Sequence, residues 1–138
     1  MTVRPASSSQ LPTVLVVSSD PARLRLVAHS LQLEFDVVVA SDVRSAALQL
    51  IQTSPCVVLT DLEVAGVRGA TFVRWLRQRK KTMPVAVLGD GESTHAVLAI
   101  QSGANALLQS PFRPVDLLER VRRLVRRSSW PAALPRSA

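Results

Sequence analysis

The sequence is poor in cysteine and in long apolar runs, and both shortages exclude classes of protein. Cys56 is the single cysteine of 138 residues, so the chain has no internal disulfide and no cysteine-rich zinc site. We interpret Cys56 as a small buried residue at the start of a strand. No apolar run approaches the roughly 18 residues that span a bilayer, and no signal-peptide core is recognisable. We therefore expect a cytoplasmic protein without a membrane segment.

Histidine is scarce as well, and this argues against metal-dependent or nucleophilic catalysis. His29 and His95 have no His or Cys partner at the spacing of metal ligands. No Ser-His-Asp arrangement is suggested, and Gly89-Asp90-Gly91 is too short to be a phosphate-binding loop. We expect both histidines on helix faces, and we do not expect the chain to be an enzyme.

The sequence does contain short apolar runs that alternate with amphipathic segments. Nearly half of the residues are hydrophobic (47%), which is typical of a globular domain. We predict strands at 13–17, 36–40, 56–60, 84–88 and 105–109. Helix starts are indicated at Ser19-Asp20-Pro21, Ser41-Asp42, after Gly69, near Ser93 and at Pro114. Five alternating strand–helix units predict a doubly wound α/β fold, a parallel sheet with helices on both faces.

The two ends of the chain differ in composition from this middle part. Residues 1–12 are rich in Ser and Pro and lack periodicity, so we interpret them as a flexible leader. Residues 128–138 are interpreted as a tail. The predicted organisation is therefore one domain, residues 13–127, between two short extensions.

Three motifs, in order and at matching distances, resemble the response-regulator receiver domain, the CheY-like family. The first is Val57–Glu63, followed by Gly69; the second is Met83–Leu88; the third is Ser102–Leu108, followed by Pro111-Phe112. The resemblance covers roughly residues 13–127. It implies a five-stranded parallel sheet with strand order 2-1-3-4-5, a flavodoxin-like single domain, and a role in bacterial two-component signalling.

The resemblance also implies a phosphoacceptor position, Asp61, at the end of the third strand. The positions around it depart from the family pattern. Two acids that help to bind Mg²⁺ are replaced by Ser18 and Ser19, with Asp20 next to them. A Thr or Ser that follows the phosphoryl group is replaced by Gly89, a Lys by Ser110, and an aromatic switch residue by Leu107. The family's Lys-Pro bond is cis, which implies a cis bond before Pro111.

These departures predict a site that has lost most of its chemistry. Serine hydroxyls are poor substitutes for the carboxylates that Mg²⁺ prefers, so we expect no magnesium site and no other cofactor. We expect Asp61 to accept hydrogen bonds from Ser18, Ser19 or Ser110, which would stabilise its ionised form without a metal. The sequence favours a stand-alone pseudo-receiver, a protein-interaction module that acts independently of phosphorylation. The alternative is a working phosphoreceiver completed by Asp20, Asp90 or a partner protein.

Basic residues dominate the charge and indicate where a partner binds. The net charge is +7. The fifth helix carries the arginines Arg120, Arg122, Arg123, Arg126 and Arg127. The resemblance implies that the face of the fourth helix, fifth strand and fifth helix binds partners or a second copy, here with an acidic partner surface. Trp75, expected to face outward beside arginines, is a second candidate contact. Nucleic acid is a third alternative, disfavoured because aromatic residues are few (4%).

Overall fold

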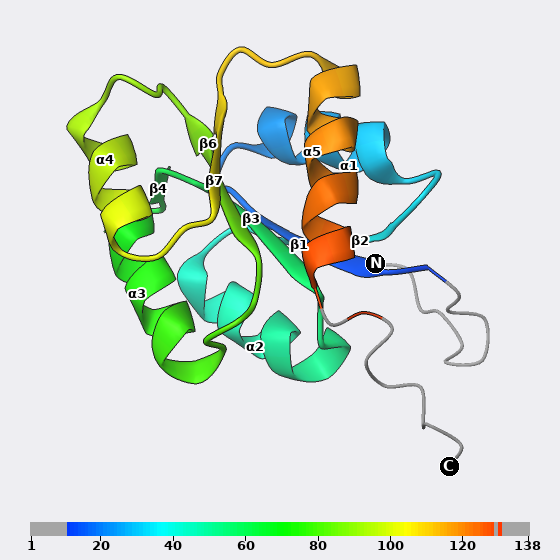
Figure 1. The fold of residues 1–138 in the computed structure, drawn as a ribbon, viewed down its shortest axis with the longest axis horizontal. Helices are drawn as coiled ribbons and strands as arrows, with labels where there is room; N and C mark the ends of the chain where they lie inside the picture. Colours follow the sequence, from blue (N-terminus) through cyan, green and yellow to red (C-terminus); the bar gives the residue numbers. More distant parts are fainter. Residues whose placement is uncertain (1–10, 129, 131–138) are drawn as a thin grey trace.

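The computed structural model describes residues 11–128 and Trp130, and the rest of the predicted leader and tail lies outside the described residues. A five-stranded parallel sheet forms the middle layer, with helices on both sides (Figure 1). Its strands are β1 (Thr13–Val17), β2 (Asp36–Ala40), β3 (Val57–Asp61), β6 (Val85–Gly89) and β7 (Ala106–Gln109). The helices are α1 (Pro21–Leu31), α2 (Val43–Thr53), α3 (Gly69–Arg79), α4 (Thr94–Gln101) and α5 (Pro114–Arg127). No helix in this described part is long and apolar enough to cross a membrane.

The strand order is β2-β1-β3-β6-β7, and every neighbouring pair is parallel. The chain moves outward from β1 to β2, returns across β1 to β3, and then continues in the other direction. The reversal between β1 and β3 opens a crevice at the carboxyl ends of these strands, where doubly wound proteins place their sites. The predicted α/β fold and its strand order are therefore confirmed.

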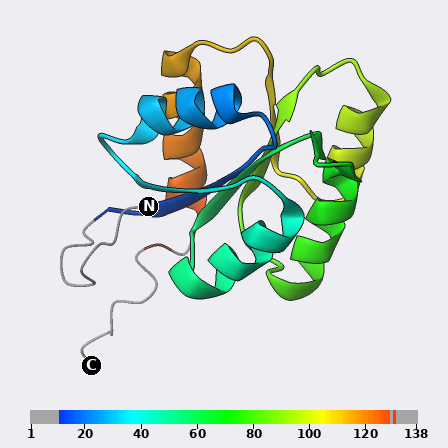
Figure 2. The ribbon, with the colours of Figure 1, turned by 180° about the vertical axis from the view of Figure 1, so that it is seen from behind.

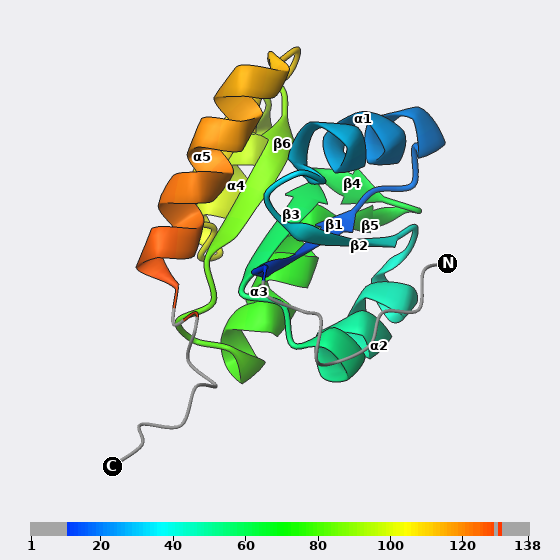
Figure 3. The same cartoon turned by 90° about the vertical axis from the view of Figure 1, so that its right-hand side faces the viewer.

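The sheet is buried on both faces, so its strands are almost continuously apolar. Helices α1 and α5 cover one face, and α2, α3 and α4 cover the other, as Figures 2 and 3 show from two further directions. Alternate residues of β1 show the division: Leu15 and Val17 belong to the core under α2–α4, whereas Val14 and Val16 belong to the core under α1 and α5. All four are fully buried.

Side-chain caps fix where the helices begin. Asp20 accepts a hydrogen bond from the Ala22 backbone N–H (3.0 Å), and Pro21 follows it in the first turn of α1. Asp42 accepts from Ser45 N–H (2.7 Å), which places the start of α2. The predicted capping at Asp20 and Asp42 is thus confirmed.

A short hairpin after β3 was not predicted from the sequence, which indicated a plain loop there. Strands β4 (Glu63–Val64) and β5 (Val67–Arg68) pair antiparallel through a tight turn at Ala65 and Gly66. Both turn residues have positive φ, +48° and +86°, as two-residue hairpins of this kind require. An alanine in such a position gives no sequence signal, because Gly, Asn and Asp are the usual residues.

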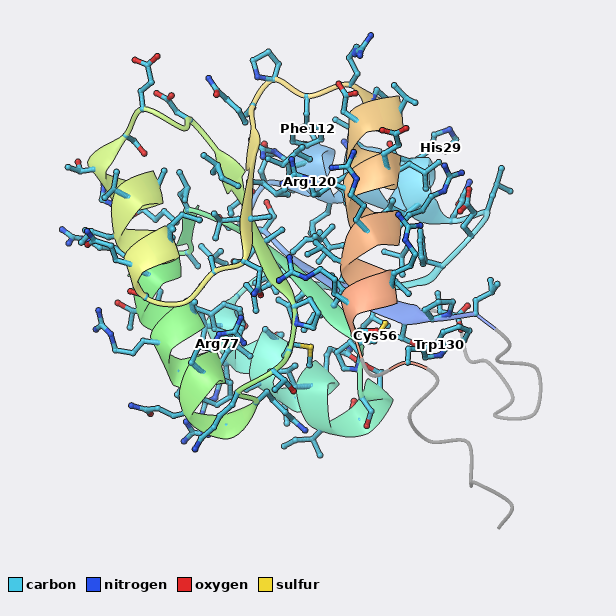
Figure 4. All side chains as sticks on the ribbon, viewed as in Figure 1. His29, Cys56, Arg77, Phe112, Arg120 and Trp130 are labelled. Carbon is cyan, nitrogen blue, oxygen red and sulfur yellow. The ribbon has the colours of Figure 1, made fainter. Side chains whose placement is uncertain are left out.

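Arg77 joins the end of α3 to the turn that precedes β7. Its guanidinium donates to the carbonyl oxygens of Gly103 (2.9 Å), Met83 (2.6 Å) and Lys80 (3.1 Å), and to Asn105 Oδ1 (2.7 Å). Figure 4 shows the side chain at the lower left of the sheet. The basic residues at the end of α3 are therefore not equivalent, because this one belongs to the internal framework.

Candidate functional site

Asp61 lies at the carboxyl end of β3, at the point where the strand order reverses. Its neighbours in the sheet are the ends of β1 and β6, which place Ser18 and Gly89 on either side of it. The Asp61 side chain is only 14% exposed. A carboxylate with so little contact with water needs partners within the protein.

Ser18 is the first of these partners. It is fully buried, and its hydroxyl donates to Asp61 Oδ2 at 2.5 Å. The Ser18 Oγ atom also accepts a hydrogen bond from the Asp20 backbone N–H (3.1 Å), which directs the hydroxyl proton toward the carboxylate. The backbone N–H of Ser18 donates to Ala40 O (3.0 Å), so the residue is held beside the end of β2, just after β1 ends. Ser18 therefore forms a rigid neutral donor at a position where the family pattern has an acid.

Arg23 is the second partner, and the sequence analysis missed it. Its Nη1 atom lies 3.3 Å from Asp61 Oδ1, and the side chain is 23% exposed. The guanidinium also lies over the ring of Phe112, 5.5 Å from the ring centroid. Phe112 marks the connection from β7 to α5 in Figure 4. One cation from α1 thus links Asp61 on β3 to the segment that leads into α5.

A signal for Arg23 was present in the sequence. It lies in the first turn of α1, which contains no acidic residue. A cation at that end of a helix interacts unfavourably with the helix dipole, so it needs a compensating partner elsewhere. Asp61, left without the Lys and the acids of the family pattern, was the available anion.

Burial controls the ionisation of Asp61. It raises the pKa of the carboxyl group above the ordinary value of 3.8. The hydrogen bond from Ser18 and the charge of Arg23 act in the opposite direction, and the nearby Asp20 carboxylate adds to the rise. The hydrogen bond expected from Ser18 is present, and the loss of hydration on burial has the larger effect on the pKa of Asp61.

The raised pKa predicts a pH dependence of stability. Between pH 3.8 and the folded pKa, the folded protein binds more protons at Asp61 than the unfolded chain. The stabilisation from Asp61 is complete below pH 3.8 and is lost as the pH rises through the folded pKa. Urea unfolding of the wild type and of Asp61→Asn across this range should show the wild type losing stability relative to the variant. A constant difference, or one of opposite sign, would contradict the assignment.

The other predicted site positions are only partly brought together. Ser19 is exposed, and the Asp20 carboxylate caps α1. Ser110 donates its backbone N–H to Gly89 O (2.9 Å), and the Ser110–Pro111 bond is cis. Among the described residues, Ser18 donates a side-chain hydrogen bond to Asp61, whereas Ser19 and Ser110 do not.

Leu62 fills the space beside Gly89. A β-carbon added at Gly89 would lie 2.5 Å from Leu62 Cδ1 and 2.8 Å from its Cγ. Leu107 is half-buried and packs against the core under α2–α4. The place of a hydroxyl and of an aromatic switch is thus taken by two aliphatic side chains. Across the part of the chain that the structure describes, no three His, Cys, Asp or Glu side chains gather as a metal site requires.

The arginines predicted to bind a partner do not form one surface. Arg122 donates from Nε and Nη2 to the Glu34 carboxylate, on the side of α5 next to α1, so it does not share a side of α5 with Arg120. Arg123 lies 3.9 Å from Glu119, and Arg126 and Arg127 are exposed. Arg120 lies on the side of α5 toward β7 in Figure 4.

Trp75, Cys56 and the histidines also differ in their exposure. Trp75 is half-buried, not exposed as expected: its ring stacks on Phe72, and the Arg79 guanidinium lies 4.3 Å from its centroid. Cys56 is half-buried, and burial raises the pKa of its thiol. Both histidines, His29 and His95, are exposed on helices, as expected.

Comparison with known proteins identifies the family. The model of the response regulator receiver domain matches residues 14–122. The chain belongs to the response regulator receiver family. The alkaline phosphatase synthesis transcriptional regulatory protein SphR of Synechococcus elongatus is 33% identical over 98% of this chain and 57% of its own length. The DNA-binding response regulator MtrA of Mycolicibacterium smegmatis is 32% identical over 83% of this chain and 51% of its own length. The chain thus spans about half the length of these relatives.

Solved receiver structures agree with this membership. A response regulator of Chloroflexus aurantiacus superimposes with a TM-score of 0.79 at 26% identity, covering 85% of this chain and 99% of its own. The chemotaxis response regulator CheY4 of Vibrio cholerae gives 0.76 at 26% identity, covering 83% and 99%. The motifs that carried the resemblance in the sequence therefore identified the family correctly, and the chain is a receiver domain of two-component signalling.

Proposed function

We propose that this receiver acts through protein contacts and does not depend on phosphorylation of Asp61. One observation carries the proposal: the Asp61 carboxylate is engaged inside the protein, because Ser18 donates a hydrogen bond to Oδ2 and the Arg23 guanidinium forms an ion pair with Oδ1 at 3.3 Å, without hydrogen-bond geometry. Phosphorylation would require the carboxylate to leave both partners and attack a phosphorus atom. The arrangement instead supports a domain held in one conformation.

The residues around Asp61 do not fit Mg²⁺. This ion prefers near-octahedral oxygen ligands with at least one or two carboxylates. The Ser18 hydroxyl is committed as a donor to Asp61, and the Asp20 carboxylate is committed to the cap of α1. A guanidinium 3.3 Å from Asp61 Oδ1 would repel a divalent cation from the same oxygen.

The residues that would respond to a phosphoryl group on Asp61 also differ from the family pattern. A phosphoaspartate acts by attracting a hydroxyl and a cation to its new oxygens. The space beside Gly89 contains the Leu62 side chain, and Ser110 brings no charge. A switch also needs an element with two arrangements, and Leu107 packs into the core without a polar tip. This supports a constant output from the domain.

The face formed by α4, β7 and α5 is the proposed contact with an acidic partner. On α4, Val97 is 50% exposed and Ile100 is 42% exposed. Together with Ala96, Gln101 and Leu107 they surround a shallow apolar hollow of about 230 Å³. The side of α5 toward β7 contributes Arg120, and the exposed Arg127 follows two turns later on the same helix. An apolar hollow between α4 and β7, together with arginines on α5, suits a protein partner with an acidic surface, or a second copy with complementary charge.

Affinity capture from the native cell tests the proposal. We expect the wild type and Asp61→Asn to retain the same partner, because the carboxylate is not the signal. The double variant Arg120→Glu, Arg127→Glu should lose it, whereas Arg25→Glu, an exposed charge reversal on α1, should retain it. If Asp61→Asn folded normally but no longer bound the partner, the proposal would be contradicted.

The second candidate function is a working phosphoreceiver. Family membership and the retention of Asp61 at the end of β3 favour it. It requires Arg23 to move away from the carboxylate and a partner protein to complete the site. Under this alternative, Asp61→Asn abolishes signalling, which separates the two candidates in the same experiment.

A further inference from the structure

A groove between α2 and α3 combines an apolar interior with a basic border, on a different side of the molecule from Asp61. It measures about 360 Å³, and its lining includes Ala47, Leu50, Ile51, Trp75, Arg79 and Lys80. This volume is comparable to that of small-molecule sites, about 300–1,000 Å³, so several side chains of a partner fit into it. The lining residues of the groove come from the C-terminal halves of α2 and α3 and the residues just after them, and both helices end toward the bottom of Figure 1.

The apolar part of this surface is unusually exposed. Ile51 is 78% exposed and lines the groove, and Leu48, one turn earlier on α2, is 56% exposed. These side chains lie next to each other because residues three apart share a helix face. Trp75 forms one wall, stacked on Phe72 from below and in contact with Arg79. Aromatic and arginine side chains together are typical of the energetic centre of an interface.

The charge around the groove has a single sign. Helices α2 and α3 contain no acidic residue, and the segment from Val43 to Gly89 contains only Asp61 and Glu63 as acids. Both of these lie at the carboxyl edge of the sheet, whereas the helices run back to the opposite edge, where the groove lies. The cations that line it are Arg79 and Lys80, both exposed, and the exposed Lys81 follows them in the sequence. An anionic partner would meet attraction without local repulsion.

We propose that this groove binds an amphipathic helix of a partner protein, with aliphatic side chains on one face and Asp or Glu beside them. The aliphatic side chains enter between Ile51 and Trp75, and the acids meet Arg79 and Lys80. This is the helix-in-groove mode of recognition, with anchors spaced three and four residues apart. The proposal does not depend on the state of Asp61, because the groove and the site share no residue.

The chain supplies its own probe for this proposal. It contains two tryptophans and no tyrosine, so Trp130→Phe leaves Trp75 as the only strong fluorophore. Into this variant of the 138-residue chain we would titrate a synthetic peptide of leucine and glutamate in amphipathic helical order. A second peptide with lysine in place of glutamate, and a short DNA duplex, serve as comparisons. We expect a saturable change in Trp75 emission with the acidic peptide but not with the lysine peptide or the DNA. Added salt should weaken the binding of the acidic peptide.

Matched variants locate the binding. Ile51→Asp and Lys80→Glu should each weaken the acidic peptide about tenfold or more. Two control variants should leave the affinity within about twofold. Leu33→Asp adds a charge at a residue that is 90% exposed and lies outside the groove, and Arg126→Glu reverses a charge on α5. All four positions are exposed, and thermal unfolding checks that each variant folds. The proposal would be overturned if the lysine peptide or the DNA bound as tightly as the acidic peptide, or if Leu33→Asp weakened the acidic peptide as much as Ile51→Asp does. It would also be overturned if the protein formed a concentration-dependent dimer that Ile51→Asp abolishes.

Discussion

Replacing Arg77 by alanine should destabilise the protein by about 3 kcal/mol, because four hydrogen bonds from one guanidinium are lost together. Three of the acceptors are backbone carbonyl groups at the joins between α3, β6 and the turn before β7. Asn105 Oδ1, the fourth, also accepts from the Val85 backbone N–H (2.8 Å), so its orientation depends on the same network. Urea unfolding at neutral pH measures the loss.

Two further variants make this prediction specific to geometry. Arg77→Lys should recover less than half of the loss, since a single ammonium group cannot reach acceptors that lie in several directions. Arg74→Ala, on the same helix, removes an exposed arginine with one long contact to Ser102 Oγ (3.4 Å) and should cost less than about 0.5 kcal/mol. Equal losses for Arg77→Ala and Arg74→Ala would show that the network contributes little.

Replacing Arg23 by glutamate should have the second large effect, because it exchanges the counter-ion of Asp61 for a like charge. Removing one member of a largely buried ion pair leaves an uncompensated charge, and a second carboxylate at the same place adds repulsion. We expect a loss of about 2 kcal/mol at pH 7. We also expect the pKa of Asp61 to rise further above its ordinary value.

The pH dependence of the Arg23→Glu variant separates charge from packing. Both carboxyl groups become neutral as the pH falls through their raised pKa values, so the loss relative to the wild type should shrink. Arg23→Gln keeps most of the contact with Phe112 without adding an anion, and it should cost less than half as much at pH 7. If the three proteins differ by the same amount at pH 7 and pH 4, the Arg23–Asp61 pair does not act through charge.

Most of the fold followed from patterns that are local in the sequence. The apolar runs at β1, β3 and β6, and the caps Asp20 and Asp42, indicate strands and helix starts directly. The strand order came with the family resemblance, because periodicity alone does not fix the order of parallel strands. The hairpin at Ala65-Gly66 was missed because its alanine adopts a left-handed conformation that the residue type does not favour.

The sequence allowed the positions of the site residues along the chain to be predicted, but not the contacts between them. The resemblance placed Asp61, Ser18, Gly89 and Ser110 correctly along the chain, yet it did not show which of them touch. The place of Arg23 in the first turn of α1 indicates a cation in need of a partner, but only the structure reveals that the partner is Asp61. Leu62 filling the space beside Gly89 is likewise a three-dimensional consequence of removing a side chain. The roles of Arg77 and Arg122 were hidden because exposed and structural arginines look alike in sequence.

The most direct test of the central claim is the intact mass of the protein after incubation with Mg²⁺ and a small-molecule phosphodonor. A receiver of the same family that retains both acids and the lysine serves as the positive control. The account predicts that this chain keeps its unmodified mass, because the Asp61 carboxylate is hydrogen-bonded to Ser18 and ion-paired with Arg23. A stoichiometric adduct of one phosphoryl group, absent from Asp61→Asn, would contradict it.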